Sequence, residues 1–365
     1  MGLATGGVQA QDTPANTFVM PRSGPFAPEQ VEIPNARAIE AWIRSGHSHA
    51  SSPAFSHWND AGEIPPVCAV CHSGQGFRSF HGLDGSDPGV PAEPVPTGGV
   101  VDCDTCHNPN LGKVTSILLP SGVDHPVTTA DAACVTCHQG RAAGVSVSRA
   151  TADSEPDTPS AELNFVNPHY AIAAATNLGG YGQNGFEYPG KTYTGRFLHA
   201  KPVETCVNCH SPHSLTVAAE TCLTCHQTGD PRAIRISRQS YDGSGNSEQG
   251  IFVDINRNAD LLMTTIRDYA RDVAGTAIVY DGAHHPYFFA DANGDGRADQ
   301  QDGRGVAYNA WTPRLLQAAY NWKFVTADSG IHVHNPHYAL ELVYDSIEDL
   351  GTALGRDIAE TGISR

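Results

Sequence analysis

Every cysteine in the chain belongs to a Cys-x-x-Cys-His unit, and this unit occurs five times. Its two thiols can bond covalently to one porphyrin, and the histidine that follows is then held against the iron as its proximal ligand. The sequence therefore predicts five haem c groups, attached at Cys68-Ala-Val-Cys71-His72, Cys103-Asp-Thr-Cys106-His107, Cys134-Val-Thr-Cys137-His138, Cys206-Val-Asn-Cys209-His210 and Cys222-Leu-Thr-Cys225-His226.

Three other uses of cysteine fit this pattern less well. A zinc ribbon pairs two Cys-x-x-Cys units around one metal ion, and five units cannot pair off. Neither zinc, nor a disulfide framework, nor a thioredoxin-like motif requires a histidine directly after each unit. The pattern favours haem over all three.

Composition indicates how the chain folds around these groups. Only 17% of its 365 residues are charged, whereas it has 37 glycines and 25 prolines. This composition is typical of a loop-rich protein whose interior is filled partly by something other than side chains. We expect a mainly α fold with extensive loops, a multihaem cytochrome c in which the haems form much of the core.

The charge of the chain narrows the choice of partners. A formal net charge of −17 argues against binding to nucleic acid or to an anionic membrane surface, since both attract basic patches. No stretch approaches the roughly 20 apolar residues that a membrane-spanning helix needs. The expected partners are redox partner proteins or an extracellular electron acceptor.

The first ten residues and the haem motifs both predict export. Residues 1–10 end in small residues before Gln11 and resemble the tail of a secretory signal peptide, so we expect a truncated start and cleavage near Ala10. Haem c is attached on the far side of the cytoplasmic membrane. The motifs therefore predict, independently, a protein of the periplasm or the cell surface.

Motif positions and composition divide the chain into three parts. Residues 1–35 are expected to hold the signal-peptide remnant and an extended segment, residues 36–230 the five haems, and residues 231–365 a helical cap. Motifs four and five are close in sequence, which predicts two neighbouring haems.

Several helices can be placed from apolar spacing and capping residues. We expect one from about residue 35 to 44, one beginning at Asn167, and one along the apolar stripe from Leu261 to Val273. Thr312-Pro313 and Asn335-Pro336 are typical of helix starts, with an N-cap residue followed by proline. They predict the last two helices.

The ligand on the other side of each iron decides whether a haem carries electrons or reacts with substrate. The three methionines are too few for five irons, whereas thirteen histidines lie outside the motifs. Two histidines on each iron give a low-potential haem with no open position. The histidines that we rank highest as distal ligands are His47, His49, His169, His199, His213, His334 and His337.

Some of these candidates compete with each other. His169 and His337 occupy the same place in a repeated Asn-Pro-His-Tyr-Ala run, at residues 167–171 and 335–339. His334 directly precedes the second copy and is a rival to His337. His213 lies too close to the proximal histidine His210 to serve the same iron readily, so we expect it to serve a neighbouring haem.

Several runs of sequence together resemble the bacterial polyhaem c-type cytochromes. They are Pro65-Pro-Val-Cys-Ala-Val-Cys-His-Ser73, Cys134-Val-Thr-Cys-His-Gln-Gly-Arg141, Asn208-Cys-His-Ser-Pro-His213, and the C-terminal segment from Tyr320 to Ile347. The resemblance covers nearly the whole chain from about residue 40. It implies electron transfer at or beyond the cell envelope and specifies no substrate.

The C-terminal His-Asn-x-x-Tyr helix is similar to one in the multihaem nitrite reductase and hydroxylamine oxidoreductase superfamily. That similarity implies His334 as the ligand, whereas the internal repeat points to His337. The nitrite reductases replace one motif histidine by lysine, and no Cys-x-x-Cys-Lys occurs here. This departure puts catalysis in doubt.

An Asp-rich loop follows the ligand positions of an EF-hand. Oxygen donors fall at positions 1, 3, 5, 9 and 12, with a glycine at position 6 and a backbone carbonyl at position 7. The predicted calcium ligands are Asp291, Asn293, Asp295, Arg297 (through its carbonyl), Asp299 and Asp302. A second, weaker candidate spans residues 242–248.

Three functions remain open from the sequence. The first is an electron relay through five haems ligated by pairs of histidines. The second is a reductase of a small nitrogen or sulfur oxyanion, with one iron open to substrate. The third is a subunit of a homo-oligomer or an extracellular cytochrome filament.

Overall fold

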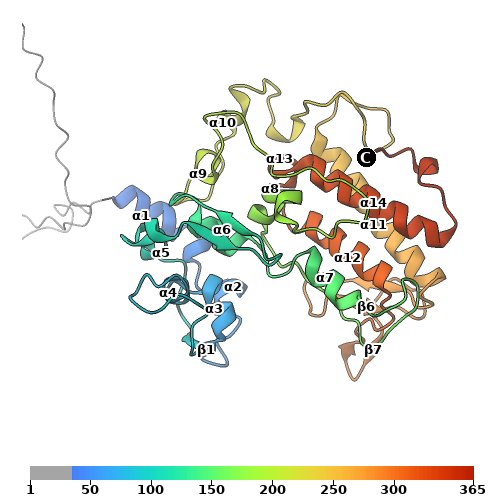
Figure 1. Ribbon diagram of the computed structural model, residues 1–365, viewed down its shortest axis with the longest axis horizontal. Coiled ribbons are helices and arrows are strands. Elements are labelled where there is room, and N and C mark those ends of the chain that lie inside the picture. The colour runs from blue at the N-terminus through green and yellow to red at the C-terminus, as the bar shows by residue number, and fades with distance from the viewer. Residues whose placement is uncertain (1–34) are drawn as a thin grey trace, which may run out of the picture.

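The computed structural model describes residues 35–365, and its secondary structure is mainly helical. The prediction for the first segment concerns residues 1–34, which lie outside the described part. Six short helices gather at one end of the molecule and the longer C-terminal helices at the other (Figure 1). In the N-terminal part they are α1 (Ala36–Ile43), α2 (Pro53–Ser56), α3 (Pro66–His72), α4 (Gly74–Phe80), α5 (Cys103–His107) and α6 (Ala132–His138).

The remaining helices run from the middle of the chain to its C-terminus. They are α7 (Gly144–Thr151), α8 (Ala173–Gly182), α9 (Cys206–Cys209), α10 (Ala219–Leu223), α11 (Ile251–Asp272), α12 (Pro313–Thr326), α13 (Ile331–His334) and α14 (Pro336–Leu354). Among residues 35–365, no helix combines the length and the apolar character needed to cross a bilayer.

The strands form four small antiparallel pairs and no larger sheet within the described residues. The pairs are β1 (Glu63–Ile64) with β2 (Val95–Pro96), β3 (Ser116–Leu118) with β4 (Asp124–Pro126), β5 (Ile278–Tyr280) with β6 (Phe288–Ala290), and β7 (Gln300–Gln301) with β8 (Arg304–Gly305). The expectation of a mainly α fold with extensive loops is confirmed.

Short helices carry the cysteine motifs. Helices α3, α5 and α6 each end at the histidine of a motif, and α9 runs between the two cysteines of the fourth. Residues three apart lie on the same face of a helix. A single helical turn therefore places both thiols of a unit on the same side. In α5 the side chain of Asp102 caps this turn by accepting a hydrogen bond from the backbone N–H of Thr105.

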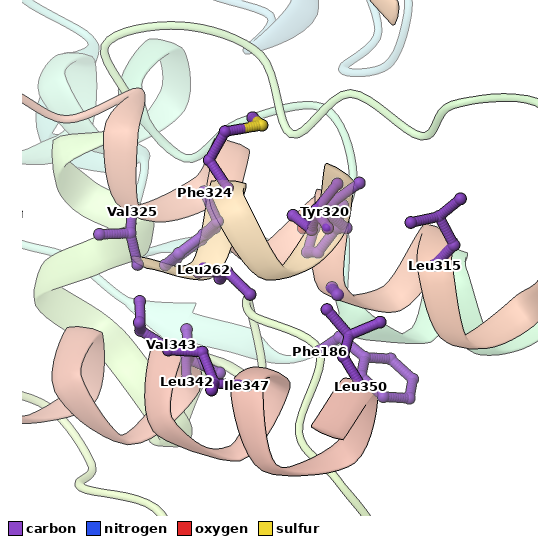
Figure 2. Packing of buried hydrophobic residues seen from close by; sticks show 14 of the residues in the cluster. Phe186, Leu262, Leu315, Tyr320, Phe324, Val325, Leu342, Val343, Ile347 and Leu350 are labelled. Atoms are coloured by element: carbon purple, nitrogen blue, oxygen red, sulfur yellow. The ribbon is translucent and has the colours of Figure 1, made fainter. Parts of the chain in front are cut away.

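Helices α11, α12 and α14 pack together around the one large apolar core of the described residues. Leu262 on α11, Phe324 on α12 and Val343 on α14 are almost completely buried in it (Figure 2). The predicted start of α12 is confirmed, since the Thr312 hydroxyl accepts a hydrogen bond from the N–H of Leu315 at 3.1 Å.

This core also draws on residues well before the predicted cap. Phe186 is buried within it, and the Asn321 side chain both accepts from the N–H and donates to the carbonyl of Phe186. Tyr320 donates to the carbonyl of Asn184 at 2.7 Å. The division at residue 230 stays a prediction, but the packing of the C-terminal helices extends across it to residues 142–193.

Apolar packing is much sparser in the N-terminal part. There the buried apolar residues form three separate clusters of three or four members, around Phe77, Ile117 and Ile64. Helices α9 and α10 bury no residue at all. The regions that carry the five motifs therefore have little protein core of their own.

The helix predicted to begin at Asn167 is wrong. Residues 167–172 are not helical, and α8 begins only at Ala173. The Asn167 side chain accepts from the N–H of His169 at 2.9 Å, and the φ angles of His169 (95°) and Ala171 (50°) are left-handed, which a right-handed helix does not accommodate. The second copy of the repeat behaves as predicted, because Asn335 caps α14.

Candidate haem sites

The structure places the ring of one other histidine close to the ring of every motif histidine. The five pairs use ten different histidines, and within residues 35–365 no other two histidine rings come as close. The ring centroids are separated by 5.9 Å for His72 and His169, 5.9 Å for His107 and His213, 6.4 Å for His138 and His47, 6.3 Å for His210 and His334, and 6.0 Å for His226 and His199.

These separations fit two imidazoles that bind opposite sides of one metal ion. A metal–imidazole nitrogen bond is about 2 Å long and a ring centroid lies about 1 Å beyond its nitrogen, which gives ~6 Å between centroids. The angles between ring planes vary from 10° to 87°. An axial pair tolerates such variation because each ring can turn about its own metal–nitrogen bond. The donor set therefore fits five haem irons.

Hydrogen bonds hold several of these rings by their Nδ1 atoms. His72 Nδ1 lies 2.6 Å from the carbonyl oxygen of Ala54, and His138 Nδ1 lies 2.6 Å from that of Ala171. When Nδ1 donates to such an acceptor, the lone pair of the imidazole is on Nε2, where a metal can bind. These bonds thus fix both the tautomer and the direction of the ring.

The protonation of the paired rings also suits ligation. Burial lowers the pKa of His169 to about 4 and lowers the pKa values of His47, His72 and His210 from their usual range. A neutral imidazole is the form that binds a metal. These four rings are therefore neutral and able to act as ligands at neutral pH.

Two of the seven ranked histidines do not lie opposite a motif histidine. His49 is exposed at the end of a short turn, and the ring of His337 packs against Tyr241 at 5.8 Å between centroids. The structure therefore favours His47 over His49 and His334 over His337 as candidate distal ligands. The ring of His213 lies beside that of His107, the histidine of another motif, and its role as a ligand stays a prediction.

Residues 167–172 serve two of these sites at once. His169 faces His72 of the first motif, while the carbonyl of Ala171 braces His138 of the third. The left-handed residues of this segment turn the His169 ring and the Ala171 carbonyl toward neighbouring sites. A regular helix would bring residues two apart to different faces.

The influence of the cysteine thiols on one another indicates which motifs are neighbours. A hydrogen bond with the Cys137 thiol lowers the pKa of Cys71, and one with Cys206 lowers the pKa of Cys134. Burial, together with the nearby Cys134, raises the pKa of Cys106 to about 11. The third motif therefore adjoins the first, the second and the fourth.

The fourth motif in turn adjoins the fifth. Burial, together with the nearby Cys222, raises the pKa of Cys209. All ten cysteines are free thiols in the described residues, where each sulfur stands in for the thioether of an attached haem. The proximity of the sulfurs, rather than their acidity, is what matters for the mature protein.

Asp328 is a residue that sequence reasoning missed. Its carboxylate oxygen Oδ2 lies 2.6 Å from His334 Nδ1, and only 5% of its side chain is exposed. The position of an acidic residue six places before a ranked histidine was the only signal in the sequence, and such a spacing is common by chance.

The predicted calcium loop is compact, but its side chains bind the loop itself. Asp291 is buried and accepts from the N–H groups of Asp295 and Gly296, each at 3.0 Å. The N–H of Arg297 donates to Asp295, and Asp302 lies in the turn between β7 and β8. No three acidic, histidine or cysteine side chains of residues 35–365 converge as a cation site, and calcium binding stays a prediction.

In the weaker candidate at residues 242–248, the first carboxylate is already bound by protein groups. The Asp242 carboxylate accepts from the Arg257 guanidinium and from the hydroxyl of Ser244, both at 2.6 Å. A carboxylate engaged in this way has fewer lone pairs to offer a cation.

Comparisons with known proteins found relatives by sequence alone. No protein-family model and no solved structure matches the chain. The C-type polyheme cytochrome OmcB from two Geobacter sulfurreducens strains is 26% identical over 390 residues, covering 87% of this chain and 48% of OmcB. The C-type polyheme cytochrome OmcC from the same species is 24% identical over 374 residues, covering 86% and 46%. The chain thus spans about half the length of these curated relatives.

Proposed function

We propose that the chain, which is similar to C-type polyheme cytochromes over most of its length, transfers electrons outside the cytoplasm through five haem c groups, each ligated by two histidines. When bound, a haem supplies an iron that exchanges one electron between its ferric and ferrous forms. The chain's own residues attach this group, orient it and close its axial positions.

The observation that carries the proposal is the one-to-one pairing of histidine rings. Each motif histidine has a single neighbouring histidine ring at 5.9 to 6.4 Å between centroids. Where Nδ1 is hydrogen-bonded, as in His72, His138 and His334, the lone pair of the ring is left on Nε2. With both axial positions of each iron taken by imidazole, a small molecule has nowhere to bind the metal. This arrangement favours electron transfer over the reduction of a nitrogen or sulfur oxyanion, which needs an open position.

The proximity of the cysteines supports an order for the relay. The first and second haems would both adjoin the third, the third the fourth, and the fourth the fifth. Helix α6, which carries the third motif, thus occupies the junction of a branched path. Electrons could leave at the first, second or fifth haem.

The partners we propose are redox proteins or an acceptor outside the cell. The net charge of −17 favours partners with basic surfaces, since charge complementarity increases the rate of encounter. The five opposing histidines all come from this chain, so no second subunit is needed to complete a site. We therefore favour a periplasmic or cell-surface carrier over a filament subunit.

Spectroscopy of the exported protein tests this function. We expect every ferric haem to be low-spin and the reduced protein to give no spectral change with carbon monoxide, because both axial positions of all five irons are occupied. A high-spin signal, or carbon monoxide binding by about one fifth of the haem, would support the reductase alternative instead.

A further inference from the structure

Asp328 gives one of the five histidine pairs an electrostatic environment that the described residues give to no other. His72 and His138 are braced by the neutral carbonyl oxygens of Ala54 and Ala171. His334 instead donates from Nδ1 to a carboxylate, with the Asp328 oxygen 2.6 Å away. In residues 35–365, no other paired histidine has an acidic side chain as its hydrogen-bond partner.

The Asp328 carboxylate is buried and rigidly held. Its side chain is 5% exposed, and Oδ2 also accepts from the Thr176 hydroxyl at 2.5 Å. The other oxygen accepts from the N–H of Gly330 at 2.9 Å. Three donors stabilise the ionised form, and no lysine or arginine of the described residues forms an ion pair with it. Among the described residues, His334 is the only side chain able to carry a positive charge that pairs with this carboxylate, so the negative charge acts mainly on His334.

A carboxylate behind a ligating histidine changes the metal site in two ways. It draws the Nδ1 proton toward itself, so that Nε2 becomes a stronger electron donor to the metal. It also places a buried negative charge near the iron, where low dielectric makes that charge effective. Both effects stabilise the ferric form over the ferrous form, because the ferric iron carries one more positive charge.

On the basis of the function proposed above, we propose that Asp328 makes the haem held by Cys206, Cys209, His210 and His334 the hardest of the five to reduce. This haem lies between the third and the fifth in the proposed order. Asp328 is thus a positioning residue that acts through His334, and it sets an energy step within the relay.

A purely structural role for Asp328 predicts a different outcome. Substitution of Thr176 distinguishes that role from an effect on His334. Both side chains tie the turn before α13 to helix α8, since Thr176 lies on α8. If Asp328 only holds this turn, loss of either group should have the same effect. If it acts on His334, loss of the Thr176 hydroxyl leaves the carboxylate free to interact more strongly with the ring.

The test is a spectroscopic redox titration of the full-length holoprotein carrying Asp328→Asn. We expect about one fifth of the absorbance change to move to higher potential, with a roughly tenfold change in the reduction equilibrium, or about 59 mV for one electron. One low-spin ferric signal in the electron paramagnetic resonance spectrum should change with it. Asp328→Glu, which keeps the negative charge but moves it, should give a smaller shift in the same direction, and this smaller shift is the test if Asp328→Asn loses haem.

The matched control is Thr176→Val. In this variant, the part of the absorbance change that moves in Asp328→Asn should stay in place or move to lower potential. A titration of Asp328→Asn that superimposes on the wild-type curve would overturn the inference, and so would an equal upward shift in Thr176→Val. Neither result affects the proposed ligation, which is judged on the wild-type protein by its haem content and its low-spin spectrum.

Discussion

Replacing His334 with alanine is expected to convert one of the five haems to a high-spin form that binds carbon monoxide when reduced. The His334 ring lies 6.3 Å from that of His210, and its removal would leave an iron with one imidazole and one open position. About one fifth of the haem should then respond to carbon monoxide, against none in the wild-type protein. The change is read from the visible spectrum of the reduced protein.

His337→Ala is the matched control for this experiment. His337 occupies the position that the internal repeat favours, but its ring packs against Tyr241 at 5.8 Å and not against a motif histidine. We expect its loss to leave all five haems low-spin. If His337→Ala produced the carbon monoxide complex and His334→Ala did not, our assignment of the fourth site would be wrong.

Without haem attachment, the N-terminal part of the chain is expected to remain unfolded while the C-terminal helices still pack. The buried apolar side chains of residues 36–139 form only clusters of three or four around Phe77, Ile117 and Ile64, and the Ile117 cluster includes Leu178 of α8. Such clusters cannot offset the conformational entropy of ordering about a hundred residues, which costs roughly 1 to 2 kcal/mol per residue. The free energy of opening should therefore be near zero in this part.

The C-terminal core has far more buried apolar surface. Helices α11, α12 and α14 bury Leu262, Phe324 and Val343 together with residues from 142–193, and we expect an opening free energy of roughly 5 kcal/mol or more there. Limited proteolysis of chain produced without haem maturation measures both parts. Cleavage should be rapid between residues 45 and 138 and slow between residues 251 and 354, whereas the holoprotein should resist in both.

Equal protection of the two parts in the haem-free chain would contradict this view of the fold. It would mean that the N-terminal helices have sufficient packing of their own, and that haem is not their core. Rapid cleavage throughout would mean that the C-terminal helices also depend on haem, for example through His334 next to α14.

The sequence was most informative where a local pattern is sufficient to determine the structure. Thr312-Pro313 begins a helix because a hydroxyl cap and a proline satisfy the first turn without any long-range contact. The cysteine motifs are equally local, since one turn of helix aligns both thiols. These features could be predicted residue by residue.

Long-range packing determines which of the two repeated Asn-Pro-His segments begins a helix. Asn167-Pro-His169 and Asn335-Pro-His337 have identical local chemistry, yet only the second begins a helix. The Asn335 side chain also donates to the carbonyl of Gly195, a contact far away in sequence. The first copy instead forms a left-handed turn that serves two sites, and no local signal distinguishes the two.

The choice among histidines shows the same limit. His47 and His49 are both near the first motif in sequence, but His47 faces His138 of the third motif. A histidine can serve any iron that the fold brings near it, and sequence distance carries little information about that. The role of the buried Asp328 carboxylate could not be predicted either, because it depends on a contact with His334 that only the fold creates.

The central claim is that this chain carries five covalently bound haems, and the mass of the exported protein under denaturing conditions tests it most directly. We predict the mass of the mature polypeptide plus five haems, with none released by acid and organic solvent, because each group is held by two thioether bonds. A mass equal to that of the bare polypeptide, or to that of a polypeptide with fewer haems, would contradict the claim.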